Sequence, residues 1–149
     1  MRYKADFPNL NTKTPDGIAP GGRHYKVIVV DSREFSRKQI AQILESEEYD
    51  IVATAAHGKE ALAHYERLNG KVDLITTELD MPVLDGYALV FELKERGNTS
   101  PIVFVSDETT KGVMQDLITM GVKDYILKPV NRRILLERVK KVMVKYSGG

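Results

Sequence analysis

The chain has 149 residues, 42% of them hydrophobic and 29% charged, which is typical of one soluble globular domain. Its 22 Lys and Arg nearly balance its 21 Asp and Glu, so a formal charge of +1 gives no general attraction to nucleic acid or anionic membranes. The absence of cysteine excludes disulfides, thiolate nucleophiles and cysteine-based metal sites, and the apolar runs are too short to span a membrane. The first residues lack the apolar core of a signal peptide, so we expect a cytoplasmic protein.

Residues 1–24 are predicted to form a flexible N-terminal extension, because they combine Pro8, Pro15, Pro20 and the pair Gly21-Gly22 with scattered apolar residues. The extension is either a tail that packs against nothing or a docking segment for a partner. The domain itself is expected at residues 25–146, followed by a short tail at 147–149.

From residue 25 onward, short apolar strands alternate with helical patterns. The run at residues 27–30 is continuously β-branched, as expected for a strand buried on both faces of a parallel sheet. Five strands alternating with five helices predict an α/β fold, a parallel sheet with helices on both faces. The predicted strands are residues 27–30, 51–55, 72–77, 102–105 and 124–127, and the third and fifth helices are expected at residues 86–96 and 132–145.

Four chemically useful side chains each follow the end of a predicted strand. They are Asp31, Glu78, Ser106 and Lys128. In open parallel sheets, ligands sit beyond the carboxyl ends of the strands, where the strand order reverses. The sequence therefore predicts one polar pocket at this edge of the sheet.

The segments KVIVVDS, DLITTELDMPVLDG, PIVFVS and DYILKPV occur in this order within residues 26–146. This part of the chain resembles the receiver domain of bacterial two-component response regulators, in particular the stand-alone chemotaxis type. The resemblance implies a flavodoxin-like (βα)5 three-layer sandwich with strand order 2-1-3-4-5. It also implies a role in phosphorelay signal transduction, in which an Asp after the third strand takes a phosphoryl group with Mg²⁺ bound beside it.

Two positions depart from that family pattern. Glu78 stands where the phosphoacceptor Asp is expected, and Asp31-Ser32 stands where an acidic pair is expected. A shift of one residue would make Asp31 the second acid of the pair, but the ungapped register with Arg37 and Ile40 disfavours it.

The substitutions weaken the expected metal site. The resemblance leaves Asp31, Glu78 and the carbonyl of Asp80 as ligands, while Ser32 offers only a neutral hydroxyl. Losing a unit charge ~4 Å from a cation costs on the order of a few kcal/mol at an effective dielectric of ~20. Weak Mg²⁺ binding is the expectation.

The glutamate also changes the expected switch. Glu78 is about one methylene longer than Asp, so it should be a poor acceptor in a reaction that depends on positioning. Its carboxylate could accept hydrogen bonds from Lys128 and Ser106 in place of phosphate. Three hypotheses stay open: partial mimicry of the phosphorylated state, a phosphorylation-independent scaffold, and residual phosphorylation.

The resemblance further assigns switch roles to Ser106, Lys128 and Tyr125. Lys128 precedes Pro129, and a cis peptide there would aim the ammonium into the pocket. Tyr125 matches an aromatic position that moves between exposed and buried states. Without the resemblance, it would read as a half-buried strand tyrosine.

The function predicted is an atypical single-domain response regulator, a pseudo-receiver that acts as a protein-interaction switch rather than as an enzyme. Its partner, a histidine kinase or a downstream target, is expected on the face of residues 110–146, and the chain is expected to be a monomer or weak homodimer.

The alternative is a carboxylate-dependent phosphatase or phosphotransferase, although the spacing of Glu78 and Asp80 only approximates the paired aspartates that such enzymes need. A flavin or nucleotide site is disfavoured because no glycine-rich loop follows Asp31. No nucleic-acid or membrane partner is expected.

Overall fold

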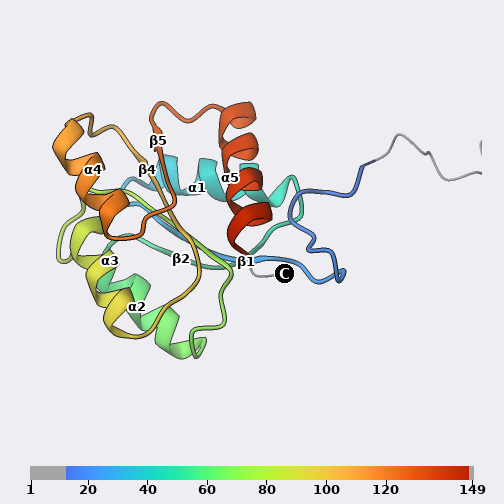
Figure 1. The fold of residues 1–149 in the computed structure, drawn as a ribbon, viewed down its shortest axis with the longest axis horizontal. Coiled ribbons are helices and arrows are strands. Elements are labelled where there is room, and N and C mark those ends of the chain that lie inside the picture. The colour runs from blue at the N-terminus through green and yellow to red at the C-terminus, as the bar shows by residue number, and fades with distance from the viewer. Residues whose placement is uncertain (1–12, 148–149) are drawn as a thin grey trace, which may run out of the picture.

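The computed structural model describes residues 13–147, which form five strands and five helices in strict alternation (Figure 1). The elements are β1 (Lys26–Val30), α1 (Glu34–Glu45), β2 (Asp50–Ala55), α2 (Gly58–Arg67), β3 (Leu74–Thr77), α3 (Gly86–Glu95), β4 (Ile102–Ser106), α4 (Lys111–Thr119), β5 (Asp124–Leu127) and α5 (Arg132–Tyr146). These bounds agree with the predicted ones to within one or two residues.

All five strands form one parallel sheet in the order β2-β1-β3-β4-β5. Helices α1 and α5 cover one face, and α2, α3 and α4 cover the other (Figure 1). The predicted flavodoxin-like sandwich is confirmed. β2 and β3 lie on opposite sides of β1, so the strand order reverses at this point. The carboxyl ends of β1 and β3 therefore flank the switch point.

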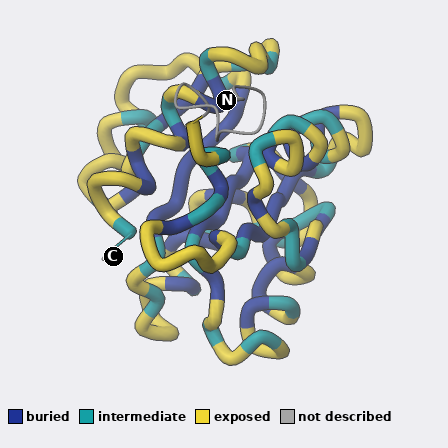
Figure 2. The backbone as a smooth tube through the Cα atoms, turned by 90° about the vertical axis from the view of Figure 1, so that its right-hand side faces the viewer, coloured by how far each residue is buried: buried dark blue, intermediate teal, exposed yellow. Residues whose placement is uncertain are grey.

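The two faces of the sheet have separate hydrophobic cores, and the alternation of strand side chains divides residues between them. Ile28, Ile75 and Phe104 pack toward α2, α3 and α4, whereas Val27 and Val103 pack toward α1 and α5. Figure 2 shows the result, with buried backbone along the strands and exposed backbone on the outer sides of the helices. Burial on both faces explains why the strands read as continuous apolar runs.

Two helix starts are fixed by side-chain caps that the sequence places at the right positions. The Asp85 carboxylate accepts a hydrogen bond from the Ala88 N–H at the start of α3, and the Asn131 side-chain oxygen accepts one from the Ile134 N–H at the start of α5. Each cap satisfies a backbone donor that the helix leaves unpaired. Asp85 is therefore a structural residue.

The prediction that residues 1–24 lie outside the folded domain was wrong for residues 13–24. Ile18 and His24 form an antiparallel bridge, Ala19 is buried, and the Gly17 N–H donates to the Glu47 carbonyl at 2.7 Å. The hydrogen bond from Gly17 to the loop after α1 joins residues far apart in the sequence, and composition does not reveal such a contact. Residues 1–12 lie outside the described part of the chain.

Along residues 13–147, no helix combines the length and the apolar character that a bilayer crossing requires.

Candidate functional site

Three of the predicted site residues meet at the carboxyl ends of the strands. The Lys128 ammonium lies 2.6 Å from Glu78 Oε2 and 2.9 Å from Asp31 Oδ2. Their side chains are almost fully buried, with exposed fractions of 8% for Lys128, 5% for Glu78 and 0% for Asp31. The Lys128-Pro129 peptide is cis, as predicted. The arrangement is one ammonium held between two carboxylates that come from separate strands.

The backbone holds both carboxylates in place. Glu78 Oε1 accepts a hydrogen bond from the Leu79 N–H at 2.9 Å, and Asp31 Oδ1 accepts one from the Arg33 N–H at 2.9 Å. Each carboxylate therefore has one oxygen bound to a backbone donor and the other directed at Lys128. Two charge-assisted contacts for each group offset part of the cost of burying it.

Gly86 allows the start of α3 to press against the Glu78 loop. A Cβ at this position would clash with the Glu78 carbonyl oxygen and would lie 2.8 Å from the Phe104 ring. The Gly86 N–H also donates to the Leu79 carbonyl at 2.8 Å. The glycine after Asp85 is thus required by the close approach of two backbones, and this approach fixes the path of the chain on either side of Glu78.

The charges in the site are strongly coupled. Burial by itself lowers the pKa of the Lys128 ammonium, but the hydrogen bonds and charges of Glu78 and Asp31 outweigh it, so that this pKa lies above its ordinary value. With one cation and two buried anions, the ammonium stays protonated at neutral pH. Lys128 is therefore the counter-ion of both carboxylates.

Ser106 and Tyr125 lie beside this cluster, but their hydroxyls are bound elsewhere. The Ser106 Oγ accepts a hydrogen bond from the Glu108 N–H at 3.2 Å, and the Tyr125 hydroxyl donates to the Glu108 carbonyl at 3.0 Å. The Tyr125 ring is buried and stacks on Phe104 with 5.7 Å between centroids, and burial raises the pKa of its phenol. The loop after β4 is thus fastened through Glu108 to Ser106 and Tyr125, two of the three predicted switch residues.

The residues present do not make up the acidic set of a typical receiver metal site. Asp31 and Glu78 already share one ammonium, Ser32 is neutral, and the Asp80 residue is exposed at the mouth of the pocket. Across the residues that the structure describes, no three acidic, histidine or cysteine side chains are grouped to hold a metal ion. The weak Mg²⁺ site expected at Asp31, Glu78 and Asp80 stays a prediction.

Sequence reasoning missed the pair that flanks the mouth of this pocket. The Arg33 guanidinium lies 3.5 Å from the Asp107 carboxylate, and both residues line the same opening as Ser32, Glu78 and Asp80. Both side chains are more than half exposed, so the contact contributes little to stability. Their positions directly after Ser32 and Ser106 were the available signal.

Comparison with known proteins decides the family. The model of the response regulator receiver domain matches residues 27–140. The chain belongs to the response regulator receiver family. The CheY chemotaxis protein of Treponema pallidum is 36% identical to it over 143 residues, a match that covers 96% of this chain and 99% of that protein. CheY of Listeria monocytogenes is 29% identical over 116 residues, which cover 78% of this chain and 96% of that protein.

Solved receiver structures agree with this assignment. A chain in the CheX–CheY–BeF3–Mg²⁺ complex of Borrelia burgdorferi has a TM-score of 0.84 and 31% identity, covering 88% of this receiver and 98% of that chain. A CheY-like receiver protein of Methanospirillum hungatei has a TM-score of 0.74 and 26% identity, and the match covers 82% of this chain and 95% of that chain. The predicted resemblance to a stand-alone, chemotaxis-type receiver in two-component signalling is therefore confirmed.

Proposed function

We propose that this receiver is an atypical single-domain response regulator that works as a protein-interaction module without phosphorylation of Glu78. The alternative of a phosphatase or phosphotransferase gains no support from a cluster in which both carboxylates are already bound to the Lys128 ammonium. We expect the module to act in the cytoplasm, as a monomer or weak homodimer.

The observation that carries the proposal is that both oxygens of Glu78 are engaged. Oε2 accepts from the Lys128 ammonium at 2.6 Å and Oε1 accepts from the Leu79 N–H at 2.9 Å, while the residue as a whole is 4% exposed. A nucleophilic carboxylate oxygen must approach a phosphorus atom in line with the leaving group, and such transfer tolerates little misplacement. The bound and buried geometry of Glu78 opposes that approach.

The contact with Lys128 supports a partial imitation of the phosphorylated state. An ammonium that would bind a phosphoryl oxygen binds the Glu78 carboxylate instead. The hydrogen bonds to the Glu78 carboxylate come from Lys128 and the Leu79 N–H and not from Ser106, so the imitation rests on Lys128. One carboxylate has a single charge, whereas phosphate has nearly two, so the bias toward an active-like state is partial.

The expected partner surface is the face formed by α4, β5 and α5. Tyr125 lies on β5 and is tied through the Glu108 carbonyl to the loop that precedes α4. The face also carries Ile118, which is 50% exposed. The same loop is tied to Lys128, because the Glu108 N–H donates to Ser106 Oγ and the Lys128 N–H donates to the Ser106 carbonyl at 2.8 Å. A histidine kinase or a downstream target that binds here would sense the Glu78–Lys128 pair through these contacts. In the B. burgdorferi complex, CheX is the protein found with CheY.

The test is phosphorylation by a small acyl phosphate in the presence of Mg²⁺, followed by intact mass. We expect no phosphoryl group on the natural chain. The double variant Glu78→Asp, Ser32→Asp, which restores the family's acidic residues, should gain one. Ser32→Asp alone is the matched control, because it restores the acidic pair while keeping the glutamate, and it should remain unmodified.

A phosphoryl group on the natural chain would contradict the proposal. The variants Glu78→Gln and Asp80→Asn would then show which carboxylate accepts it. If the double variant also stays unmodified while the fold is intact, the inertness does not arise from Glu78, and the proposed cause would be wrong.

A further inference from the structure

Residues 17–25 form a small hairpin at the amino-terminal edge of the sheet, far from the carboxylate pocket. Its turn is closed by hydrogen bonds from the Ala19 N–H to the Arg23 carbonyl and from the Gly22 N–H to the Ala19 carbonyl, both at 2.8 Å. A Cβ on Gly17 would clash with the backbone of the loop after α1, so only glycine allows this docking. The hairpin is therefore an integral addition to the receiver core.

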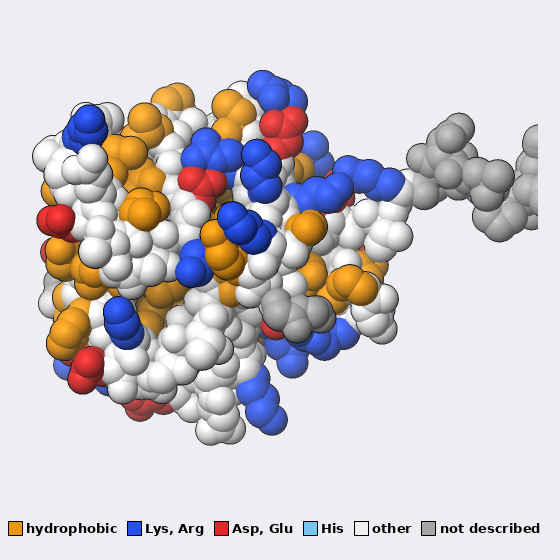
Figure 3. Space-filling view, in the orientation of Figure 1, with side chains coloured by type: hydrophobic (Ala, Val, Ile, Leu, Met, Phe, Trp, Pro, Cys, Tyr) orange, Lys and Arg blue, Asp and Glu red, His pale blue; other side chains and the backbone are white. Residues whose placement is uncertain are grey.

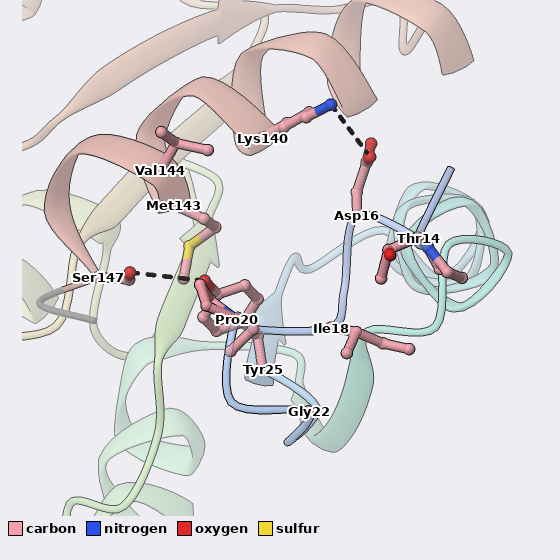
Figure 4. Close-up of a pocket in the computed structure, with 12 residues that line it drawn as sticks. Thr14, Asp16, Ile18, Pro20, Gly22, Tyr25, Lys140, Met143, Val144 and Ser147 are labelled. Atoms are coloured by element: carbon pink, nitrogen blue, oxygen red, sulfur yellow. Dashed lines mark hydrogen bonds and ion pairs between the residues drawn. The ribbon is translucent and has the colours of Figure 1, made fainter. Parts of the chain in front are cut away.

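A groove of about 550 Å³ lies between this hairpin and the carboxyl-terminal half of α5 (Figure 4). Most of its lining is apolar. The Tyr25 hydroxyl bonds weakly to Ser147 Oγ at 3.5 Å and closes one end of the groove. At the other end Lys140 approaches Asp16, as the dashed line in Figure 4 shows. The main lining side chains are Ile18, Pro20, Tyr25, Lys140, Met143 and Val144.

Val144 is an unusual residue for an exposed helix position. It is 78% exposed although it lines the groove next to Met143, which is buried. A valine so exposed beside an apolar concavity provides a surface that another apolar side chain can cover. Covering Val144 would remove its apolar surface from water and so stabilise an interface.

The rim of the groove is basic. Figure 3 shows Lys and Arg side chains gathered around α5 and the neighbouring hairpin, with apolar atoms between them. The carboxyl-terminal half of α5, which forms one wall of the groove, carries Lys140, Lys141 and Lys145 and no acidic residue. A surface with an apolar floor and this rim is complementary to an acidic chain that carries apolar side chains.

The acidic group inside the groove does not cancel this rim. The Asp16 side chain is 6% exposed and is flanked by Lys13 at 3.5 Å and Lys140 at 3.7 Å. Both contacts are longer than a normal hydrogen bond, and the Lys140 side chain stays 49% exposed. Its ammonium can therefore bind a second carboxylate that approaches from solvent.

We propose that the groove between the hairpin of residues 17–25 and α5 is a docking site for an acidic, apolar-anchored segment of a partner protein. The site is independent of Glu78 and of the proposed function. It also differs from the face of α4, β5 and α5, because half of its wall comes from residues that precede β1.

The test is mapping by amide NMR with a short synthetic peptide of Asp, Glu, Leu and Phe, added to the full chain. Shifts should concentrate in residues 13–25 and 140–147, and binding should weaken with added salt. Val144→Asp should weaken binding about tenfold. Lys140→Gln should weaken it about threefold, whereas Lys59→Gln, an exposed lysine on α2, should change nothing.

Several results would overturn the proposal. One is equal binding of a peptide with Lys and Arg in place of its acids. Another is an equal loss of binding in Ile118→Asp, which would move the site to the α4 face. Shifts in residues 1–12 caused by Val144→Asp without peptide would make this chain's own N-terminus the occupant. A dimer in sedimentation that Val144→Asp abolishes would make it a second copy, and Val144-dependent binding to phosphatidylglycerol vesicles would make it a membrane.

Discussion

Each end of the sheet has ion pairs between residues that are far apart in the sequence, and the two sets of ion pairs differ in burial. At the carboxyl end, Lys128 lies between Asp31 and Glu78 with no side chain more than 8% exposed. At the amino end, Arg23 binds both oxygens of Asp73 at 2.7 and 2.8 Å, with 55% of its own side chain exposed. A solvated pair fastens the hairpin at little cost, whereas a buried trio is stable only while all three members are present.

Removal of the shared cation should therefore have the largest effect. Lys128→Met leaves Asp31 and Glu78 buried without a counter-ion, and we expect a loss of about 3 kcal/mol in the free energy of unfolding. Urea unfolding at neutral pH measures it. In a Glu78→Gln background the same substitution should cost clearly less, because one of the two anions is already gone. Equal costs in both backgrounds would mean that Glu78 and Lys128 are not coupled.

Substitution of the two glycines that lie against backbone atoms should have the next largest effect on the free energy of unfolding. Gly86→Ala and Gly17→Ala each put a methyl group against backbone atoms, and each should cost about 2 kcal/mol. Only Gly86→Ala should shift the amide resonances of Leu79 and of the Glu78 loop. Gly112→Ala is the control, because its Cβ meets no atom and it lies within α4, so it should be neutral or stabilising. Loop shifts in Gly17→Ala would show that the two ends communicate.

The solvated pair at the amino end should have the smallest effect. Arg23→Met should lower the free energy of unfolding by about 1 kcal/mol. Lys38→Met, which removes the solvent-exposed Glu34–Lys38 pair of α1, should have a smaller effect. Burial tends to raise the pKa of Asp73, but the hydrogen bonds from Arg23 and the Lys26 N–H prevail, so the pKa lies below its ordinary value.

That depressed pKa gives the pair a pH signature. A carboxyl group with a lower pKa in the folded state stabilises the fold above the unfolded pKa of about 3.9, and this contribution disappears as the pH falls through the folded value. The difference in unfolding free energy between the natural chain and Asp73→Asn should therefore shrink below about pH 4. A difference that grows in acid would contradict the assignment.

The strands, the helices and the pocket were open to prediction because each has a local signal. The apolar run at residues 27–30, the cap at Asp85 and the polar residues after the strands are readable one segment at a time. The hairpin before β1 was not readable in this way. Its stability comes from Gly17 against the loop after α1 and from Arg23 against Asp73, pairs separated by many residues in the chain.

The sequence alone determined the alternation of strands and helices and the receiver family, and it predicted that Glu78 stands at the phosphoacceptor position. These follow from periodicity and from residue identity at fixed positions. Only the tertiary structure decided that both Glu78 oxygens are engaged, that Ser106 turns to the Glu108 N–H, and that residues 17–25 build a groove on α5. The physical reason is that hydrogen-bond partners and concave surfaces depend on distances between segments, which a linear pattern does not contain.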